Sequence, residues 1–116
     1  MDLDQIIFEH AEWKSRFRRA ISNHEQMDVT VASSDACCNL GQWLHGHGKH
    51  TFEHLDAFKQ LIQAHAAFHA EAGKVALFIQ TGDVSSAEAA LDYGSSYSRA
   101  AQAVAVAIMG FHENQK

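Results

Sequence analysis

Apolar residues recur at alternating steps of three and four along most of this chain, which is the spacing of one face of an α-helix. The longest such series predicts a helix from about Thr51 to Gln80 and comprises Leu55, Phe58, Ile62, His65, His69, Ala72, Ala76 and Ile79. His65 and His69 therefore occupy positions where a core-facing helix normally carries leucine or isoleucine. Burying an imidazole costs free energy unless it has a partner, so the sequence should supply partners for both histidines.

A similar series predicts a first helix from about Asp2 to His24, and it comprises Leu3, Ile6, His10, Trp13, Phe17, Ala20 and His24. The stretch from Glu25 to Ala32 lacks this period and is expected to be a connection. Ser33-Ser34-Asp35 then offers side-chain oxygens that can cap a second, shorter helix, which extends to about Leu44. Gly41 inside that helix costs about 1 kcal/mol of helix propensity relative to alanine. Such a glycine indicates that another segment packs close to its backbone.

Glycines and capping residues predict the remaining boundaries. His45-Gly46-His47-Gly48-Lys49-His50 predicts a turn before the central helix, and Gly82 is placed to end that helix. Asp83 and the capping box Ser85-x-x-Glu88 predict the start of a fourth helix. Four helices with short connections predict an all-α fold, an antiparallel four-helix bundle, in which residues 1–116 form a single domain.

The fourth predicted helix continues to about Phe111 and is apolar at nearly every position from Ala100 onward. A bundle covers only one side of each helix, so a helix that is apolar all round indicates a second buried surface. We therefore predict a homodimer through this Ala/Val-rich helix. The alternative is that alanine serves here only as a helix former.

Composition and charge narrow the function. The chain has no proline and only seven glycines, and its net charge is −5 with the histidines neutral, so it offers no basic surface for nucleic acid. No apolar run reaches the roughly 18 residues of a membrane span. The opening Met1-Asp2-Leu3-Asp4-Gln5 is acidic, unlike a secretory signal, and we expect a cytoplasmic domain without membrane contact. The adjacent Cys37 and Cys38 should then remain thiols.

The candidate chemistry comes from the histidines, of which the chain has nine. His10, His65 and His69 lie on core-facing series, and a thiol from Cys37 or Cys38 on the second helix would complete a set of four ligands. Zinc prefers four nitrogen and sulfur donors in a tetrahedron, and such sites form inside bundles from facing helices. The alternative is that these histidines are hydrogen-bonded core residues without a metal.

Other histidines are expected to be solvated. His50-x-x-x-His54 has the same spacing as the central pair but lies beside charged residues and follows two glycines. Between the two cysteines, helical periodicity alone favours Cys37, because Leu40 and Leu44 share a helix face with it.

Three motifs together resemble a known family. Cys38-Asn39-Leu40-Gly41-Gln42-Trp43-Leu44 resembles the Cys-x-Leu/Phe-Gly-x-Trp signature of bacterial chemoreceptor zinc-binding (CZB) domains, and His10-x-x-Trp13-Lys14 and His65-Ala66-Ala67-Phe68-His69 occur at the family's places and in its order. The resemblance covers essentially the whole chain. It implies a four-helix bundle with one Zn²⁺ bound in its core. Its implied ligands are His10, Cys38, His65 and His69, and Cys37 is then assigned to packing.

The resemblance also implies a function. Members regulate an attached or partner signalling unit, commonly a chemoreceptor or a diguanylate cyclase, and respond to zinc or to oxidants such as hypochlorous acid. Four protein ligands leave no open position on zinc, which is typical of a regulatory rather than a catalytic site. Since the sequence also has no phosphate-binding loop, kinase motif or cyclase motif, we predict that it is not an enzyme.

Two other classes remain as alternatives. A hemerythrin-like di-iron oxygen-binding bundle would need carboxylates on the core-facing series, and none occurs there, because Glu9, Glu12, Glu53 and Glu71 flank them. A metal-free helical interaction module would leave the histidines incidental. An iron chromophore would support the first alternative, and thermal stability unaffected by a chelator would support the second.

Overall fold

The computed structural model describes residues 3–36 and 38–114, and all regular structure within these ranges is α-helical, which confirms the all-α part of the predicted fold class. The helices are α1 (Leu3–Asn23), α2 (Val29–Ser33), α3 (Asn39–His45), α4 (His47–Phe52), α5 (Asp56–Gln80), α6 (Val84–Ala90) and α7 (Ser96–Asn114). Within the described residues, no helix is both long enough and apolar enough to cross a membrane.

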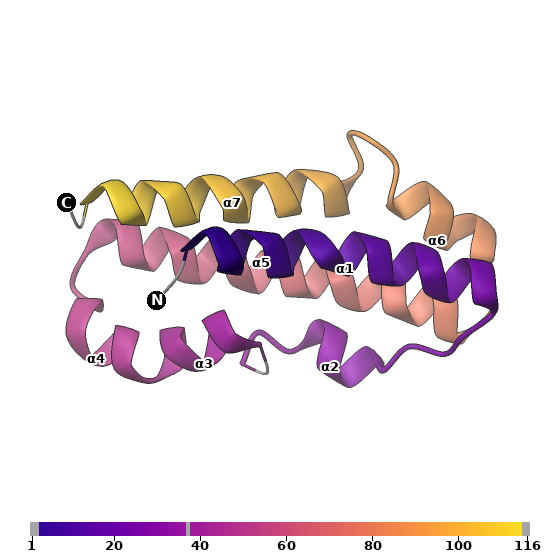
Figure 1. Ribbon diagram of the computed structural model, residues 1–116, viewed down its shortest axis with the longest axis horizontal. Coiled ribbons are helices and arrows are strands. Elements are labelled where there is room, and N and C mark those ends of the chain that lie inside the picture. Colours follow the sequence, from indigo (N-terminus) through magenta and orange to yellow (C-terminus); the bar gives the residue numbers. More distant parts are fainter. Residues whose placement is uncertain (1–2, 37, 115–116) are drawn as a thin grey trace.

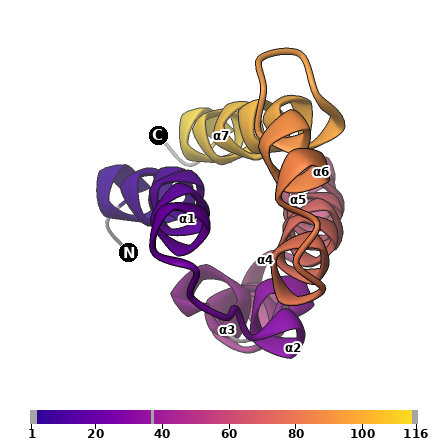
Figure 2. The same cartoon turned by 90° about the vertical axis from the view of Figure 1, so that its right-hand side faces the viewer.

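The helices are arranged around α5, which packs most extensively against α7 on one side and α2 on another. Figure 1 shows that α1, α5 and α7 run along the long axis of the molecule, and that α2, α3 and α4 follow one another in a row beneath them. Viewed along that axis, α1, α7, α5 and the row of short helices surround a common interior (Figure 2). Chain direction reverses between α1, the row of short helices, α5 and α7 (Figure 1).

The prediction for the second helix is wrong in two respects: the helix begins later, at Asn39, and another short helix precedes it. The expected connection from Glu25 to Ala32 contains α2, whose start is capped because the Asp28 carboxylate accepts a hydrogen bond from the Val31 N–H at 3.2 Å. A helix of five residues is too short to show a periodic series of apolar positions, so the sequence pattern did not predict it. Ser33-Ser34-Asp35 does not cap α3. That cap is Cys38, whose Sγ accepts from the Gly41 N–H at 3.3 Å.

The expected turn before the central helix is limited to Gly46. The two residues that follow it already belong to α4, where Gly48 packs against the ring of Trp43. The central helix α5 begins at Asp56 rather than Thr51, because the segment before it forms α4. Its predicted end is confirmed, since Gly82 adopts a φ of 81°, in the left-handed region that favours glycine.

The predicted fourth helix is two helices. The segment between α6 and α7 contains Gly94, with a φ of 81°, and the α6 cap is Asp83, which accepts from the Ser86 N–H at 3.1 Å. The Ser85-x-x-Glu88 box is therefore not the cap.

The apolar residues of α7 fall into two groups, one buried and one exposed. Val104 and Ile108 are buried inside the chain, whereas Val106 and Met109 are more than half exposed.

The prediction of close packing at Gly41 is confirmed. A Cβ atom there would fall on the Asp35 carbonyl oxygen and lie 3.1 Å from the Ala36 Cα. Both neighbours are backbone, which cannot rotate away as a side chain can. Gly41 thus lets the segment before α3 fold back over the start of that helix.

We predict that Gly41→Ala lowers the free energy of unfolding by about 2 kcal/mol or more, because the added methyl group forces two backbone segments apart. Urea denaturation followed by circular dichroism measures this change. Gly110→Ala is the matched control, since a Cβ at Gly110 meets no atom within 4 Å and the residue lies within α7. The control should raise stability by up to about 1 kcal/mol. Equal effects of the two substitutions would contradict the prediction.

Candidate metal centre

Four side chains, three from α1 and α5 and one from the residue that caps α3, converge at one point in the core. His10 comes from α1, Cys38 precedes α3, and His65 and His69 come from α5. Their ligand atoms all lie within 4.8 Å of one another. The Cys38 Sγ lies 3.8 Å from His10 Nε2, 3.2 Å from His65 Nε2 and 3.6 Å from His69 Nε2. The structure thus brings together the four residues singled out by the sequence motifs, positioned to coordinate a metal.

Local structure explains each placement. His65 and His69 lie one turn apart on α5, so both rings point to the same side of that helix. Cys38 has an extended backbone, with φ −82° and ψ 165°, as expected of a residue that caps a helix. Because Cys38 stands before the helix rather than within it, helical periodicity could not predict its direction. Cys37, which periodicity favoured, lies outside the described residues.

Hydrogen bonds to backbone carbonyls fix the orientation of two imidazoles. His10 Nδ1 lies 2.9 Å from the Ile6 carbonyl oxygen, and His69 Nδ1 lies 2.9 Å from the Ala32 carbonyl oxygen. A carbonyl oxygen can only accept, so Nδ1 carries the proton in both neutral rings, and the lone pair of each Nε2 points toward Cys38. Metal-binding histidines commonly have this arrangement, in which the nitrogen away from the metal donates to an acceptor.

Burial keeps the three imidazoles uncharged. It lowers the pKa of His65 to about 3, with further contributions from the nearby His69 and His10. Burial also lowers the pKa of His10 and of His69. Neutral imidazole is the form that binds a metal ion. His65 Nδ1 is buried and lacks a hydrogen-bond partner among the described residues.

The donor set fits zinc. Tetrahedral Zn²⁺ with about 2.0 Å to nitrogen and 2.3 Å to sulfur places the sulfur about 3.5 Å from each nitrogen, and the three observed separations lie between 3.2 and 3.8 Å. Without a cation, the lone pairs on His10 and His69 would compete for a single thiol proton. Burial raises the pKa of the Cys38 thiol. A dication at this point would oppose that effect and favour the thiolate.

The other histidines stay outside the cluster. His45 lies on the surface, with Nε2 3.5 Å from a carboxylate oxygen of Asp35. His50 and His54, the rival pair, are exposed, as expected. Sequence reasoning missed the contribution of Ala32, whose carbonyl orients His69. A backbone carbonyl carries no residue-specific signal, so only the fold could reveal this contact.

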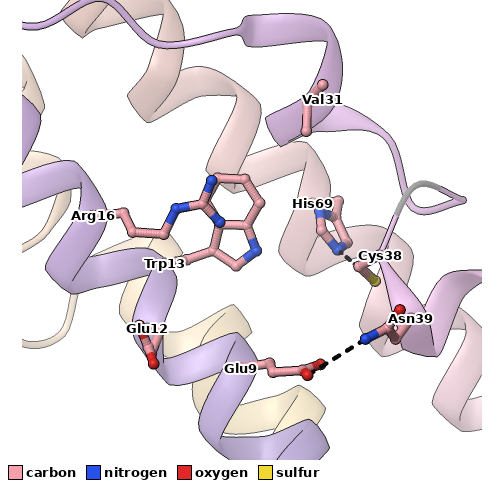
Figure 3. Close-up of a pocket in the computed structure, with 8 residues that line it drawn as sticks. All are labelled: Glu9, Glu12, Trp13, Arg16, Val31, Cys38, Asn39 and His69. Carbon is pink, nitrogen blue, oxygen red and sulfur yellow. Dashed lines mark hydrogen bonds between the residues drawn. The ribbon is translucent and has the colours of Figure 1, made fainter.

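A cleft on the surface reaches the cluster at Cys38 and His69. It has a volume of about 370 Å³, and its lining residues are Glu9, Glu12, Trp13, Arg16, Val31, Cys38, Asn39 and His69. Figure 3 shows Cys38 and His69 on one side of this cleft and the α1 residues on the other. Cys38 is partly buried, whereas the three histidines are buried. The sulfur is therefore the ligand atom best placed to meet small molecules from solvent.

Comparison with known families agrees with this geometry. The sequence profile of the chemoreceptor zinc-binding domain family matches residues 10–76. The chain belongs to this family. The matched segment of this chemoreceptor zinc-binding domain starts at His10 and includes Cys38, His65 and His69. No curated protein and no solved structure matches the chain. The family description makes Zn²⁺ the metal for this cluster and places the chain among zinc-binding domains of chemoreceptor-type signalling.

We predict that the metal-free protein loses stability as the pH falls below about 6.5. The folded state keeps His65 neutral because its pKa is about 3, whereas the unfolded chain takes up a proton near the ordinary value of 6.5. Lowering the pH from about 7.5 to about 5.5 should therefore cost about 1.4 kcal/mol for this residue alone. Burial of His10 and His69 acts in the same direction. Urea unfolding of chelator-treated protein at both pH values measures the loss.

The matched variants for this experiment are His65→Gln and His54→Gln. Removing the buried His65 should reduce the loss between the two pH values by about 1.4 kcal/mol. Removing His54, which is exposed, should leave the loss unchanged. A pH dependence that is the same in both variants would mean that burial of His65 does not control it.

Proposed function

We propose that residues 1–116 form one cytoplasmic sensory domain, in which His10, Cys38, His65 and His69 hold a single Zn²⁺ and Cys38 is the responsive ligand. The observation that carries this proposal is the double role of the Cys38 sulfur. The same atom faces three imidazole nitrogens and accepts the hydrogen bond that caps α3. A change at the sulfur therefore acts on the metal and on a helix at once.

A closed site suits regulation better than catalysis. Four protein ligands fill the coordination that zinc prefers, so no position is left for an activated water or a substrate. The family is a regulatory one. We accordingly assign no catalytic residue, and we expect the domain to act through a partner or attached signalling unit, such as a chemoreceptor or a diguanylate cyclase.

The response follows from the chemistry of a thiolate. Hypochlorous acid oxidises the Cys38 thiolate by two electrons, the sulfur gains the hydroxyl oxygen to become a sulfenic acid, and chloride leaves. A sulfenic acid is a poorer zinc ligand than a thiolate, so the metal loses one of its four donors. Loss of zinc by competition with other binding sites would have the same result. In either case the Cys38 sulfur is no longer held in the position from which it caps α3.

A shift of α3 can reach the last helix through aromatic contacts. The ring centroid of Trp43, in α3, lies 5.8 Å from that of Phe111, in α7, and 6.1 Å from that of Phe58, in α5. Packed rings of this kind transmit displacement because the interior has no free volume to absorb it. We therefore place the output on α7, with α2, α3 and α4 acting as the movable fourth side of a four-helix bundle.

The output surface is a homodimer contact on α7. Val106 and Met109 are exposed there, at 58% and 52%. Val106 also lines a groove of about 760 Å³ between α5 and α7, whose other lining residues are largely small residues and glutamines, including Ala103, Ala107 and Gly110. Small residues allow a second helix to approach closely, which supports pairing of two copies through this face.

Of the alternatives, the di-iron bundle has less support. Among residues whose burial is described, the buried polar side chains are His10, His65 and His69, so the core contains no carboxylate to bridge two irons. The metal-free module would leave these three histidines facing one thiol without a cation to bind their lone pairs. Zinc therefore explains the donor set better than either alternative.

We predict that the purified chain retains about one zinc ion, and that a stoichiometric amount of hypochlorous acid releases it, because oxidation removes the thiolate ligand. Elemental analysis after gel filtration, with and without oxidant, measures the metal. Chelation should also lower the thermal unfolding temperature. Iron in place of zinc would support the di-iron alternative, and no metal together with an unchanged unfolding temperature would support the metal-free module.

The adjacent cysteines provide the matched variants. Cys38→Ala should lose zinc or retain it weakly, as should His69→Ala. Cys37→Ala should retain zinc and still release it to oxidant. If Cys37→Ala loses zinc and Cys38→Ala does not, the assignment of the ligand is wrong.

We predict that Val106→Glu shifts the chain from dimer toward monomer, because it introduces a charge into an apolar contact. Sedimentation or light scattering at several concentrations measures the mass. Leu77→Glu is the control, since Leu77 is also exposed, at 48%, but lies on α5. Substitution at Val104 or Ile108 would not test the dimer, because both are core residues of one chain. A monomeric wild type would overturn the dimer proposal.

A further inference from the structure

Two openings lead from the surface to the residues of the candidate metal centre, and they differ in polarity. The first is the cleft of about 370 Å³ shown in Figure 3, whose lining includes Cys38 and His69. The second has a volume of about 230 Å³, and its lining residues are Ile7, His10, Ala11, Ala101, Gln102, Val104, Ala105 and Ile108. Gln102 and His10 are the polar side chains of that second lining. A hydrated dication would have to give up most of its water to pass it.

The first cleft carries charges that suit a cation. Two carboxylates, Glu9 and Glu12, line it on the α1 side. Its one positive side chain, Arg16, lies over the ring of Trp13, with the guanidinium carbon 4.1 Å from the ring centroid. Figure 3 shows Arg16 lying along Trp13, while Glu9 extends toward Asn39. The carboxylate of Glu9 is therefore nearer to the α3 side of the cleft than the guanidinium is.

Glu9 also spans the two sides of the cleft next to two proposed ligands. Its Oε1 accepts from Asn39 Nδ2 at 3.4 Å and from Gln5 Nε2 at 3.4 Å. Glu9 precedes His10, and Asn39 follows Cys38, so this contact stands directly beside the ligand that is only partly buried. Hydrogen bonds of this length are weak, and the carboxylate can exchange them for a passing cation.

We infer that Zn²⁺ enters and leaves through this cleft, and that Glu9 is the residue that receives the ion and transfers it to Cys38. This inference rests on the proposed zinc site. The Glu9 carboxylate would hold the incoming ion briefly, the Cys38 thiol would give up its proton to water in the cleft so that its sulfur can bind the metal, and the three imidazoles would supply the other donors. Glu9 acts in transit and is not a ligand of the bound ion.

Rates of metal exchange distinguish this role from a structural one. The chelator-treated full chain is mixed with Zn²⁺ in a stopped-flow instrument and uptake is followed by competition with a chromophoric chelator, while release is followed with excess chelator. Glu9→Gln should slow uptake by about threefold or more, since one carboxylate no longer attracts the ion. Release should slow as well, so that Kd changes by a smaller factor than the uptake rate.

Matched variants make the result decisive. Glu88→Gln removes the same charge from an exposed position on α6 and should leave both rates unchanged. Ala11→Leu narrows the apolar opening and should also leave them unchanged. Glu9→Asp keeps the charge and should restore most of the uptake rate. The slowing in Glu9→Gln should shrink in concentrated salt, because salt screens the attraction.

Other outcomes would overturn the inference. An unchanged uptake rate in Glu9→Gln, or slower uptake with an unchanged release rate, would mean that Glu9 does not act on the ion in transit. Slower exchange in Ala11→Leu would place the route at the apolar opening. These results leave the zinc site itself intact, whereas a wild-type chain that takes up no zinc would refute the proposed function.

Discussion

The Cys38 sulfur is the atom on which the centre of this molecule depends. It stands 3.2 to 3.8 Å from three imidazole nitrogens, and it also accepts the backbone hydrogen bond that caps α3. Serine, threonine, aspartate and asparagine are the usual helix caps. A cysteine in that position adds a sulfur atom that can both bind a metal and be oxidised. None of the usual caps offers both properties. The fold of α3 and the state of the site are thereby linked through one atom.

The three imidazoles of the site are buried, whereas Cys38 is only partly buried. His65 and His69 share one face of the central helix, and the carbonyls of Ile6 and Ala32 orient the rings of His10 and His69. Burial keeps all three imidazoles neutral, so each offers a lone pair rather than a charge. Three buried nitrogen donors and one partly buried sulfur are the arrangement expected of a sensor whose response is confined to a single ligand.

Packing of α3 also shows how a local change could spread. Gly41 sits directly against the backbone of Asp35, and Gly48 lies against the ring of Trp43. The same tryptophan contacts Phe58 and Phe111, on two of the long helices. A close-packed interior repositions neighbouring groups when one element moves. The short helices are therefore both the least regular part of the fold and the part most directly connected to the proposed ligand.

Sequence patterns alone determined the all-α class, the first helix, the end of the central helix and the four residues that meet in the core. They succeeded there because long helices repeat their buried positions every three to four residues, and because the cysteine motif is specific. They did not predict α2 and α4, the break between α6 and α7, or the cap of α3, since helices of five to seven residues have too few turns to show a period. Only the tertiary structure decided that Cys38 caps a helix, that Ala32 orients His69, and that one polar cleft reaches the sulfur. Each of these depends on contacts between segments distant in sequence, which a one-dimensional pattern does not contain.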